Sequence, residues 1–205
     1  MTMNKRDIFK GLLAGILIGI GAWALLSSPD WIVGACLFSL GLISVFILDF
    51  NLYTGKVGFF NFQKKKEEIK KLLIIVVLNI IGITFLALIA ILCNPPLITS
   101  AQAAVGARLA DTFIANFLRA LIDAIMCGVL IHLAVVFWKQ TKNLFLVVLP
   151  IMIFILCGFE HCIADVFYFV AAGSWDIFWF IPVCILGNAI GAIGIQKMLE
   201  FSNKE

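Results

Sequence analysis

Six long apolar stretches dominate this chain and limit what it can fold into. The hydrocarbon core of a bilayer is about 30 Å thick, so a helix needs about 20 apolar residues to cross it. Stretches of that kind run over residues 9–27, 31–50, 72–93, 112–137, 144–170 and 177–196. In a chain of 205 residues that is 63% hydrophobic and 13% charged, they leave no room for a soluble domain. We therefore predict an all-α polytopic membrane protein with one transmembrane domain over residues 1–205.

The first stretch has some features of a secretory signal peptide, because Lys5, Arg6 and Lys10 precede an apolar run. That run is longer than the usual signal core, and the Ser27–Asp30 segment that follows lacks a small-x-small cleavage site. We expect the segment to be retained as the first membrane span.

Lys and Arg gather in alternate connections, which predicts the orientation of the helices, since these residues favour the cytoplasmic side. If the chain begins in the cytoplasm, the cytoplasmic segments hold most of its basic residues: Lys5, Arg6, Lys10, Lys64, Lys65, Lys66, Lys70, Lys71, Lys139, Lys142, Lys197 and Lys204. The predicted external loops, including residues 94–111, hold only Arg108. Both termini are thus predicted to be cytoplasmic. The net charge of +3 reflects topology, with lipid headgroups as a second contact for the 64–71 cluster, and it does not indicate nucleic acid binding.

The sequence contains no motif that indicates an enzyme, a metal site or a cofactor site. The six cysteines lack metal-ligand spacing, and we interpret them as packing residues. Glu160-His161 lacks the second histidine of a zinc-binding helix, and neither G-x-S-x-G nor a phosphate-binding loop is present. We predict no enzyme activity, no metal and no cofactor.

Two short patterns suggest an internal repeat. Asn79-Ile-Ile-Gly82 lies in the third stretch and Asn188-Ala-Ile-Gly191 in the sixth, so the same N-x-x-G closes each half of the chain. Because each half has three spans, the second copy would insert upside down, as in transporters built from inverted repeats.

Polar residues interrupt the second and fifth stretches. Asp49-Phe-Asn-Leu-Tyr-Thr-Gly-Lys56 ends the second, and Gly158-Phe-Glu-His161 lies near the middle of the fifth. Backbone leaves a membrane helix only where it is buried in protein or lines a cavity, so two interruptions predict a solute path. A kinked helix with a satisfied polar cluster is the alternative.

Ionisable residues inside spans cost about 2.5–3.5 kcal/mol each on insertion scales, so Glu160, His161 and Asp165 need a purpose or mutual pairing. His161 and Asp165 are four apart, which predicts a shared helix face and a bond between them, or else Glu160 binds backbone amides freed at Gly158. His161 is either a structural residue or one that hydrogen-bonds a small anion and lends it a proton.

The remaining polar residues fall into two groups. Thr54 offers a hydroxyl in the other break, and Lys56 beside it either attracts anions or extends to the interface. Arg119 and Asp123 have the spacing of a helical ion pair, and we predict that pair. His132 stands alone on an apolar helix, so we interpret it as structural.

The order of these features resembles the formate/nitrite transporter family of bacterial and archaeal pentameric anion channels across nearly the whole chain. The segments that carry the resemblance are Ala14-Gly15-x-x-Ile18-Gly19, Phe38-Ser39-Leu40-Gly41-Leu42, Leu52-Tyr53-Thr54-Gly55, Phe117-Leu118-Arg119-Ala120, Gly158-Phe159-Glu160-His161 with Ala164, and Pro182-Val183 with Leu186-Gly187-Asn188-x-x-Gly191. The G-F-E-H and G-N-x-x-G matches at this separation are the specific ones.

The resemblance implies an aquaporin-like protomer of six helices in two inverted repeats, one pore in each protomer of a homopentamer, and a place in a bacterial or archaeal cytoplasmic membrane. It implies that His161 is the central pore histidine and Thr54 the omega-loop threonine, between two hydrophobic constrictions. We expect His161, Thr54, Lys56, Arg108 and Asn188 along the substrate path. Supporting positions are expected at Glu160, Asp165, Asn51, Asn79, Asp123 and Arg119.

Several residues depart from the family pattern. Asn51 stands where the family has an acidic residue, and Lys56 and Asp165 each stand where it has an asparagine. Ala124 also replaces a family asparagine, and Asp123 lies beside it. Arg108 stands near the place of a pore-lining lysine. A carboxylate four residues from His161 is expected to stabilise its imidazolium.

The sequence therefore predicts a channel or proton-linked transporter for a small monovalent anion or its conjugate acid, such as formate, nitrite, hydrosulfide, acetate or lactate. A channel for small neutral solutes and a non-transporting membrane scaffold are the alternatives.

Overall fold

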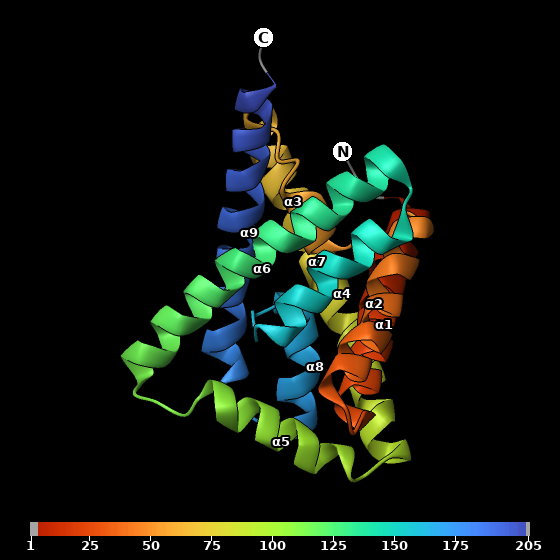
Figure 1. The fold of residues 1–205 in the computed structure, drawn as a ribbon, viewed down its shortest axis with the longest axis vertical. Coiled ribbons are helices and arrows are strands. Elements are labelled where there is room, and N and C mark those ends of the chain that lie inside the picture. The colour runs from red at the N-terminus through yellow and green to blue at the C-terminus, as the bar shows by residue number, and fades with distance from the viewer. Residues whose placement is uncertain (1–3, 204–205) are drawn as a thin grey trace.

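The computed structural model describes residues 4–203 as a bundle of helices (Figure 1), and Lys204 lies outside the described residues. The helices are α1 (Lys5–Ser27), α2 (Trp31–Ile47), α3 (Tyr53–Val57), the short 3-10 helix η1 (Phe62–Lys64), α4 (Lys65–Cys93), α5 (Leu97–Arg108), α6 (Phe113–Thr141), α7 (Leu144–Leu156), α8 (Cys162–Ala172) and α9 (Ile177–Ser202). Polar side chains cap several helices: Asn4, Asp30, Thr112 and Asn143 each accept a backbone N–H of the helix that follows.

Within residues 4–203, four helical segments are long and apolar enough to cross a membrane: α1, α6, α9 and the continuous segment Phe62–Cys93. The predicted spans 31–50 and 144–170 are shorter, because α2 has 17 residues and the fifth stretch is divided into α7 with 13 and α8 with 11. Both predicted interruptions are therefore present as real breaks in the helices.

One prediction about the connections was wrong. Residues 94–111 were expected to form an external loop, but most of them form α5, which packs across α8. Leu97, Ala101 and Val105 recur every four residues and are buried, so they make one apolar face. A twelve-residue helix is too short to cross a bilayer, which is why a search for long apolar runs misses it.

The two breaks are built in the same way. At the end of α2, Asp49 has a φ of 49°, the Phe50 N–H bonds the Val45 carbonyl, and the Asp49 N–H bonds the Phe46 carbonyl. At the end of α7, Gly158 has a φ of 72°, and the N–H groups of Phe159 and Gly158 bond the carbonyls of Phe154 and Ile155. Both are Schellman motifs, in which a left-handed residue ends the helix. After each, three residues outside any helix lead into α3 or α8, and the last of them, Leu52 or His161, is extended.

Two buried asparagines hold the new helix starts. Asn79 Oδ1 accepts from the Tyr53 N–H at 2.9 Å, and Asn188 Oδ1 accepts from the Cys162 N–H at 3.0 Å. Their amide groups donate to two carbonyls each: Asn79 to Gly11 and Asn51, and Asn188 to Ala124 and Glu160. The N-x-x-G pattern thus marks side chains that satisfy the unpaired N–H groups of a broken helix.

The same pattern also marks close helix packing. A Cβ added at Gly82 of α4 would overlap the Leu12 carbonyl oxygen of α1, and one at Gly191 of α9 would overlap the Ile125 carbonyl oxygen of α6. These glycines let each pair of backbones touch, as small residues do between membrane helices.

Replacing Gly191 with alanine is expected to destabilise the protein by about 1–3 kcal/mol, because the added methyl group must push α9 away from α6. Gly194→Ala, one turn further along α9, is the matched control, since nothing lies within 4 Å of its added Cβ. Thermal unfolding in detergent should show a lower melting temperature for Gly191→Ala alone. Equal melting temperatures would contradict the packing argument.

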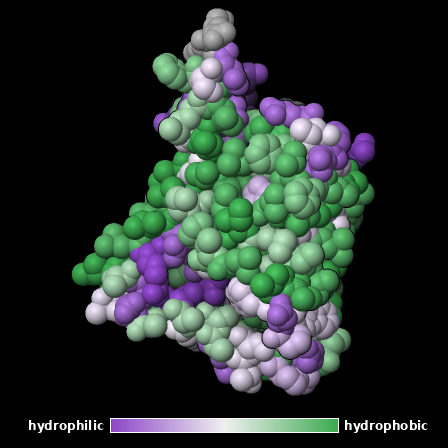
Figure 2. All heavy atoms as spheres, viewed as in Figure 1, coloured by the Kyte–Doolittle hydropathy of each residue, from purple (hydrophilic) through white to green (hydrophobic). Residues whose placement is uncertain are grey.

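The surface agrees with a membrane location. Figure 2 shows a broad apolar middle with hydrophilic residues gathered toward the two ends, and a hydrophilic hollow between α5 and the lower part of α6. Exposed apolar side chains include Leu92, Phe178 and Phe201, which are 80%, 71% and 80% exposed. Such side chains need lipid or another protein surface around them.

Candidate solute pathway

His161 lies where the two broken helices meet. It is the N-cap of α8, and its Nδ1 accepts the Ala164 N–H at 3.1 Å. Its Nε2 lies 3.0 Å from Thr54 Oγ1 on α3, and both side chains are buried. Because Nδ1 acts as an acceptor, the neutral ring carries its proton on Nε2 and donates it to the threonine oxygen. A second proton on the ring would have to displace the Ala164 hydrogen bond.

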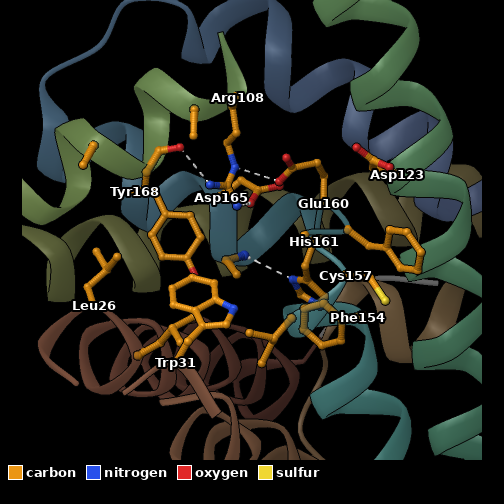
Figure 3. A pocket seen from close by; sticks show the side chains of 18 of the residues that line it. Leu26, Trp31, Arg108, Asp123, Phe154, Cys157, Glu160, His161, Asp165 and Tyr168 are labelled. Atoms are coloured by element: carbon orange, nitrogen blue, oxygen red, sulfur yellow. Dashed lines mark hydrogen bonds and ion pairs between the residues drawn. The ribbon is translucent and has the colours of Figure 1, made fainter. Parts of the chain in front are cut away.

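A cavity of about 530 Å³ opens from the His161 side toward α5. Its apolar wall includes Trp31, Leu26 and Phe154, and the Phe154 ring stacks on the imidazole at a centroid distance of 5.8 Å. Figure 3 shows His161 beside Phe154, with the charged side chains of the cavity on the opposite side from Trp31. A small solute in this cavity would meet apolar walls and a few polar groups, as ligand sites usually provide.

Arg108 and Arg119 both line this cavity, and Arg108 is the one that pairs with its buried carboxylates. Its Nε donates to Glu160 Oε2 at 2.8 Å, its Nη2 lies 3.6 Å from Asp165 Oδ1, and its guanidinium carbon lies 5.0 Å from the centre of the Tyr168 ring. The arginine comes from α5, while the other residues come from α8 and the extended segment before it. The contacts therefore tie α5 to the second break.

A second cavity, of about 310 Å³, lies on the other side of α3. Asp49, Lys56, Lys139 and Lys142 line it, and Asp49 accepts hydrogen bonds from Lys56 at 3.1 Å and Lys10 at 3.2 Å. The two cavities share no lining residue. Leu52 lines the second cavity and His161 the first, so the break residues lie between the two.

Two predicted contacts of the second break were wrong. Asp165 does not bond His161, because the histidine is the extended N-cap residue and the four-residue helical spacing does not apply to it. Its Oδ1 instead lies near Arg108. Glu160 does not bond the freed amides through its carboxylate, since Asn188 and the imidazole already accept them.

The predicted Arg119–Asp123 pair was also wrong. Arg119 reaches back along α6 and donates to Asp111 Oδ2 at 3.0 Å and to the carbonyls of Ala107 and Arg108. It thereby fastens the end of α5 to the start of α6, because carbonyls at a helix end need donors. Asp123 lines the larger cavity instead.

The other predicted residues lie at helix junctions. Asn51 Nδ2 donates to the Asp7 carbonyl at 3.2 Å, which joins the first break to the start of α1. Asn79 and Asn188 are fully buried and use their amide groups on backbone, so they position the breaks and line neither cavity. His132 Nε2 pairs with Gln196 Oε1 at 2.7 Å, away from both. The cavity residue Tyr168 was missed, since it reads as an ordinary aromatic residue of a span.

Comparison with known proteins agrees with this geometry. The family model described as formate/nitrite transporter matches residues 3–201. The uncharacterized transporter YrhG of Bacillus subtilis (strain 168) is 29% identical over 234 aligned positions, covering 95% of this chain and 85% of the relative. Among solved structures, a pentameric formate channel with formate bound superposes with a TM-score of 0.77 at 23% identity, covering 97% of each chain.

A second solved structure, an FNT family ion channel, superposes with a TM-score of 0.79 at 17% identity and covers 98% of this chain and 90% of its own. At these identities the two structures establish the fold. The family and its structural relatives are transporters and channels, which excludes an enzyme. Because the family model matches nearly the whole chain, this multi-pass membrane protein belongs to the formate/nitrite transporter family.

Proposed function

We propose that this protein conducts a small monovalent anion, or its conjugate acid, across a bacterial or archaeal cytoplasmic membrane past His161. The observation that carries the proposal is the buried contact between His161 and Thr54 at the meeting point of two broken helices, between two cavities. Formate is the first candidate, since one structural relative is a formate channel with formate bound. Nitrite, hydrosulfide, acetate and lactate are the others.

The chemistry of the pair suits such a cargo. The Nε2–H of a neutral imidazole and the Thr54 hydroxyl are both donors that a small anion or acid can accept from. They lie between apolar side chains such as Leu52 and Phe154, so a passing solute loses its water there and depends on these donors. Hydrogen bonding at this point would select small polar solutes over ions that need a full hydration shell.

The second cavity supports the predicted orientation of the protein in the membrane. Three lysines and one aspartate line it, and it lies near the ends of the molecule where α1 begins and α6 ends. Basic residues favour the cytoplasmic side, so we assign this cavity to the cytoplasm together with both termini. Lys56, Lys139 and Lys142 would then raise the local concentration of anions at the inner mouth.

We also propose that the six predicted spans form two inverted three-helix repeats. The Schellman motifs at the two breaks, the asparagine contacts and the N-x-x-G glycine contacts support this, since each has a counterpart at the equivalent place in the other half. A homopentamer is proposed from the pentameric relative and from the exposed apolar side chains of α9. Mass photometry of the detergent-purified protein should give five chains per particle, and a monomer would contradict this.

Flux through proteoliposomes tests the role of His161. His161→Asn removes the Nε2–H donor at the apolar centre, and losing one hydrogen bond of about 1–3 kcal/mol should lower formate flux by about tenfold to a hundredfold. His132→Asn is the matched control, because His132 lines neither cavity, and it should keep wild-type flux. The measurement is stopped-flow uptake of formate, nitrite, hydrosulfide and acetate at several pH values.

Three outcomes would overturn the proposal in different ways. Equal flux through wild type and His161→Asn would remove the histidine from the mechanism. No flux of any of these anions, with passage of uncharged solutes such as glycerol, would identify a neutral-solute channel instead. No flux of either kind would favour the non-transporting scaffold.

A further inference from the structure

Positive and negative charges are unequal in the larger cavity. Arg108 is the cation shared by Glu160 and Asp165, at 2.8 and 3.6 Å. Their side chains are 18%, 6% and 1% exposed. With both carboxylates ionised, this buried cluster would carry one negative charge more than it can neutralise. A net charge at this depth in a membrane protein is costly and indicates a function.

A second observation concerns one oxygen of the cluster. Asp165 lines the cavity, and its buried Oδ2 has no partner with hydrogen-bond geometry among the described residues. The Glu160 carboxyl group and the Cys184 thiol lie next to the Asp165 side chain. An ionised oxygen left buried and unpaired is strongly unfavourable. A protonated oxygen at the same place is a hydroxyl that can donate to a solute in the cavity. Figure 3 shows the Asp165 and Glu160 side chains next to the end of the Arg108 side chain.

No neighbouring group within residues 4–203 supplies the missing positive charge. Arg119 also lines the cavity, but it is bonded to Asp111 with its side chain 41% exposed, and Asp123 adds a third carboxylate to the lining. The other titratable groups around Asp165 are three thiols and a phenol, which are Cys127 on α6, Cys162 and Tyr168 on α8, and Cys184 on α9. Helices α1 and α4 also pack against α8. Their charged residues lie within residues 5–10 and 65–71, in the first two turns of each helix.

Two carboxylates in one apolar site do not both ionise readily, because each disfavours the charge on the other. Glu160 holds the short bond to Arg108, at 2.8 Å, so Asp165 is the carboxyl group left to carry a proton. Arg108 compensates one of the two, so the neutral form of the cluster holds one proton. The neutral form is the one that a buried site favours.

We propose that the Glu160–Asp165 pair holds one exchangeable proton at neutral pH and passes it to the anion, so that the cargo moves between this cavity and His161 as a neutral acid. This inference rests on the proposed anion transport. It makes Asp165, which replaces an asparagine of the family pattern, the residue that couples proton and anion movement in this chain.

The proton moves from Asp165 to the anion inside the cavity. An anion attracted by Arg108 accepts the proton from Asp165 Oδ2: the O–H bond of the carboxyl group breaks and an O–H bond of the conjugate acid forms. The carboxylate left behind keeps its partner in Arg108. A water molecule at the cavity opening then protonates it, and the hydroxide formed leaves to the solvent on that side. Anion and proton binding favour each other, because each compensates the charge of the other.

His161 is poorly placed to be the proton source. Its Nδ1 already accepts the Ala164 N–H, so the ring holds a single proton, on Nε2, and donates that proton to Thr54. Giving it away would leave an imidazolate, whereas the carboxyl pair can give a proton and remain paired to an arginine. The histidine then aligns the neutral acid by hydrogen bonding.

The transport test compares proton and charge movement. Proteoliposomes with a formate gradient, a pH dye inside and a voltage dye should show wild type moving one proton per formate without charging the membrane. Asp165→Asn leaves one carboxylate and one arginine, so its flux should carry charge, shift the voltage dye and lose its pH dependence. Asp176→Asn is the matched control, because Asp176 lies in the connection between α8 and α9 and does not line the cavity, and it should keep the coupling.

Glu160→Gln is the second variant, since its amide oxygen can still accept from Arg108, and it should uncouple flux in the same way. An unchanged proton-to-formate ratio in both variants would overturn the proposal.

Infrared spectra test for the proton itself, and they do not depend on transport. They therefore distinguish a failure of this proposal from a failure of the proposed anion transport. Wild type at neutral pH should show a protonated carboxyl band that Asp165→Asn lacks and Asp176→Asn keeps. A wild type without this band has no such proton, and the inference fails even if anions are transported.

Discussion

Asn188→Leu should leave little folded protein. Leucine has a similar volume but removes three hydrogen bonds at once, those to the Cys162 N–H and to the Ala124 and Glu160 carbonyls. Each buried group left unpaired costs about 1–3 kcal/mol, and proteins are stable by only about 5–15 kcal/mol. The start of α8 would lose the acceptor that holds it, and His161 with it. Size-exclusion profiles and thermal unfolding of the detergent-purified protein measure the loss.

Two further variants make this test specific. Asn203→Leu, at the exposed end of the same helix, should behave like wild type. Asn188→Asp keeps an acceptor for the Cys162 N–H but loses the donors, so it should be intermediate. Asn79→Leu should be about as damaging as Asn188→Leu, because Asn79 holds α3 with the same set of contacts. A stable Asn188→Leu protein would show that packing alone holds the break.

Arg108→Gln should destabilise the protein by about 3–5 kcal/mol, the usual cost of removing one partner of a buried ion pair. Glu160 and Asp165 would be left facing each other without a cation. They must then bind protons in the folded state more tightly than in the unfolded chain. The variant should therefore gain stability as the pH falls and lose it as the pH rises. Chemical unfolding at several pH values tests this.

A rescue experiment tests whether uncompensated charge causes the loss of stability in Arg108→Gln. Arg108→Gln combined with Glu160→Gln and Asp165→Asn has no buried charge in the cluster and should recover most of the lost stability. The difference between this triple variant and Arg108→Gln measures the coupling. If the triple variant is no more stable than Arg108→Gln, the loss comes from the packing of the arginine on Tyr168 and not from its charge.

Local chemistry explains why much of the fold was predictable. The long apolar stretches needed only their length to be identified as helices, and both breaks were visible as polar residues inside apolar runs. The N-x-x-G repeat identified Asn79 and Asn188 as equivalent, and the structure gives them matching contacts. Helix α5 was missed because its apolar face is short and its helix does not span a membrane.

The pairing of the charged residues was much less predictable. Spacing along a helix suggested His161 with Asp165 and Arg119 with Asp123, and neither pair forms. The rule assumes that both residues belong to one continuous helix, and His161 stands before its helix begins. Arg108 was placed near the path, but nothing local indicated that a residue 52 positions away in sequence would be its closest partner.

By itself, the sequence determined the membrane class and the positions of the breaks, because these follow from local hydrophobicity and backbone geometry. Only the tertiary structure decided which groups face one another. It brought Thr54 to His161 across 107 positions and Arg108 to two carboxylates, leaving one oxygen of Asp165 without a partner. Contacts of this kind depend on how helices pack around a shared cavity, and the energy of a buried charge depends on every group that reaches it.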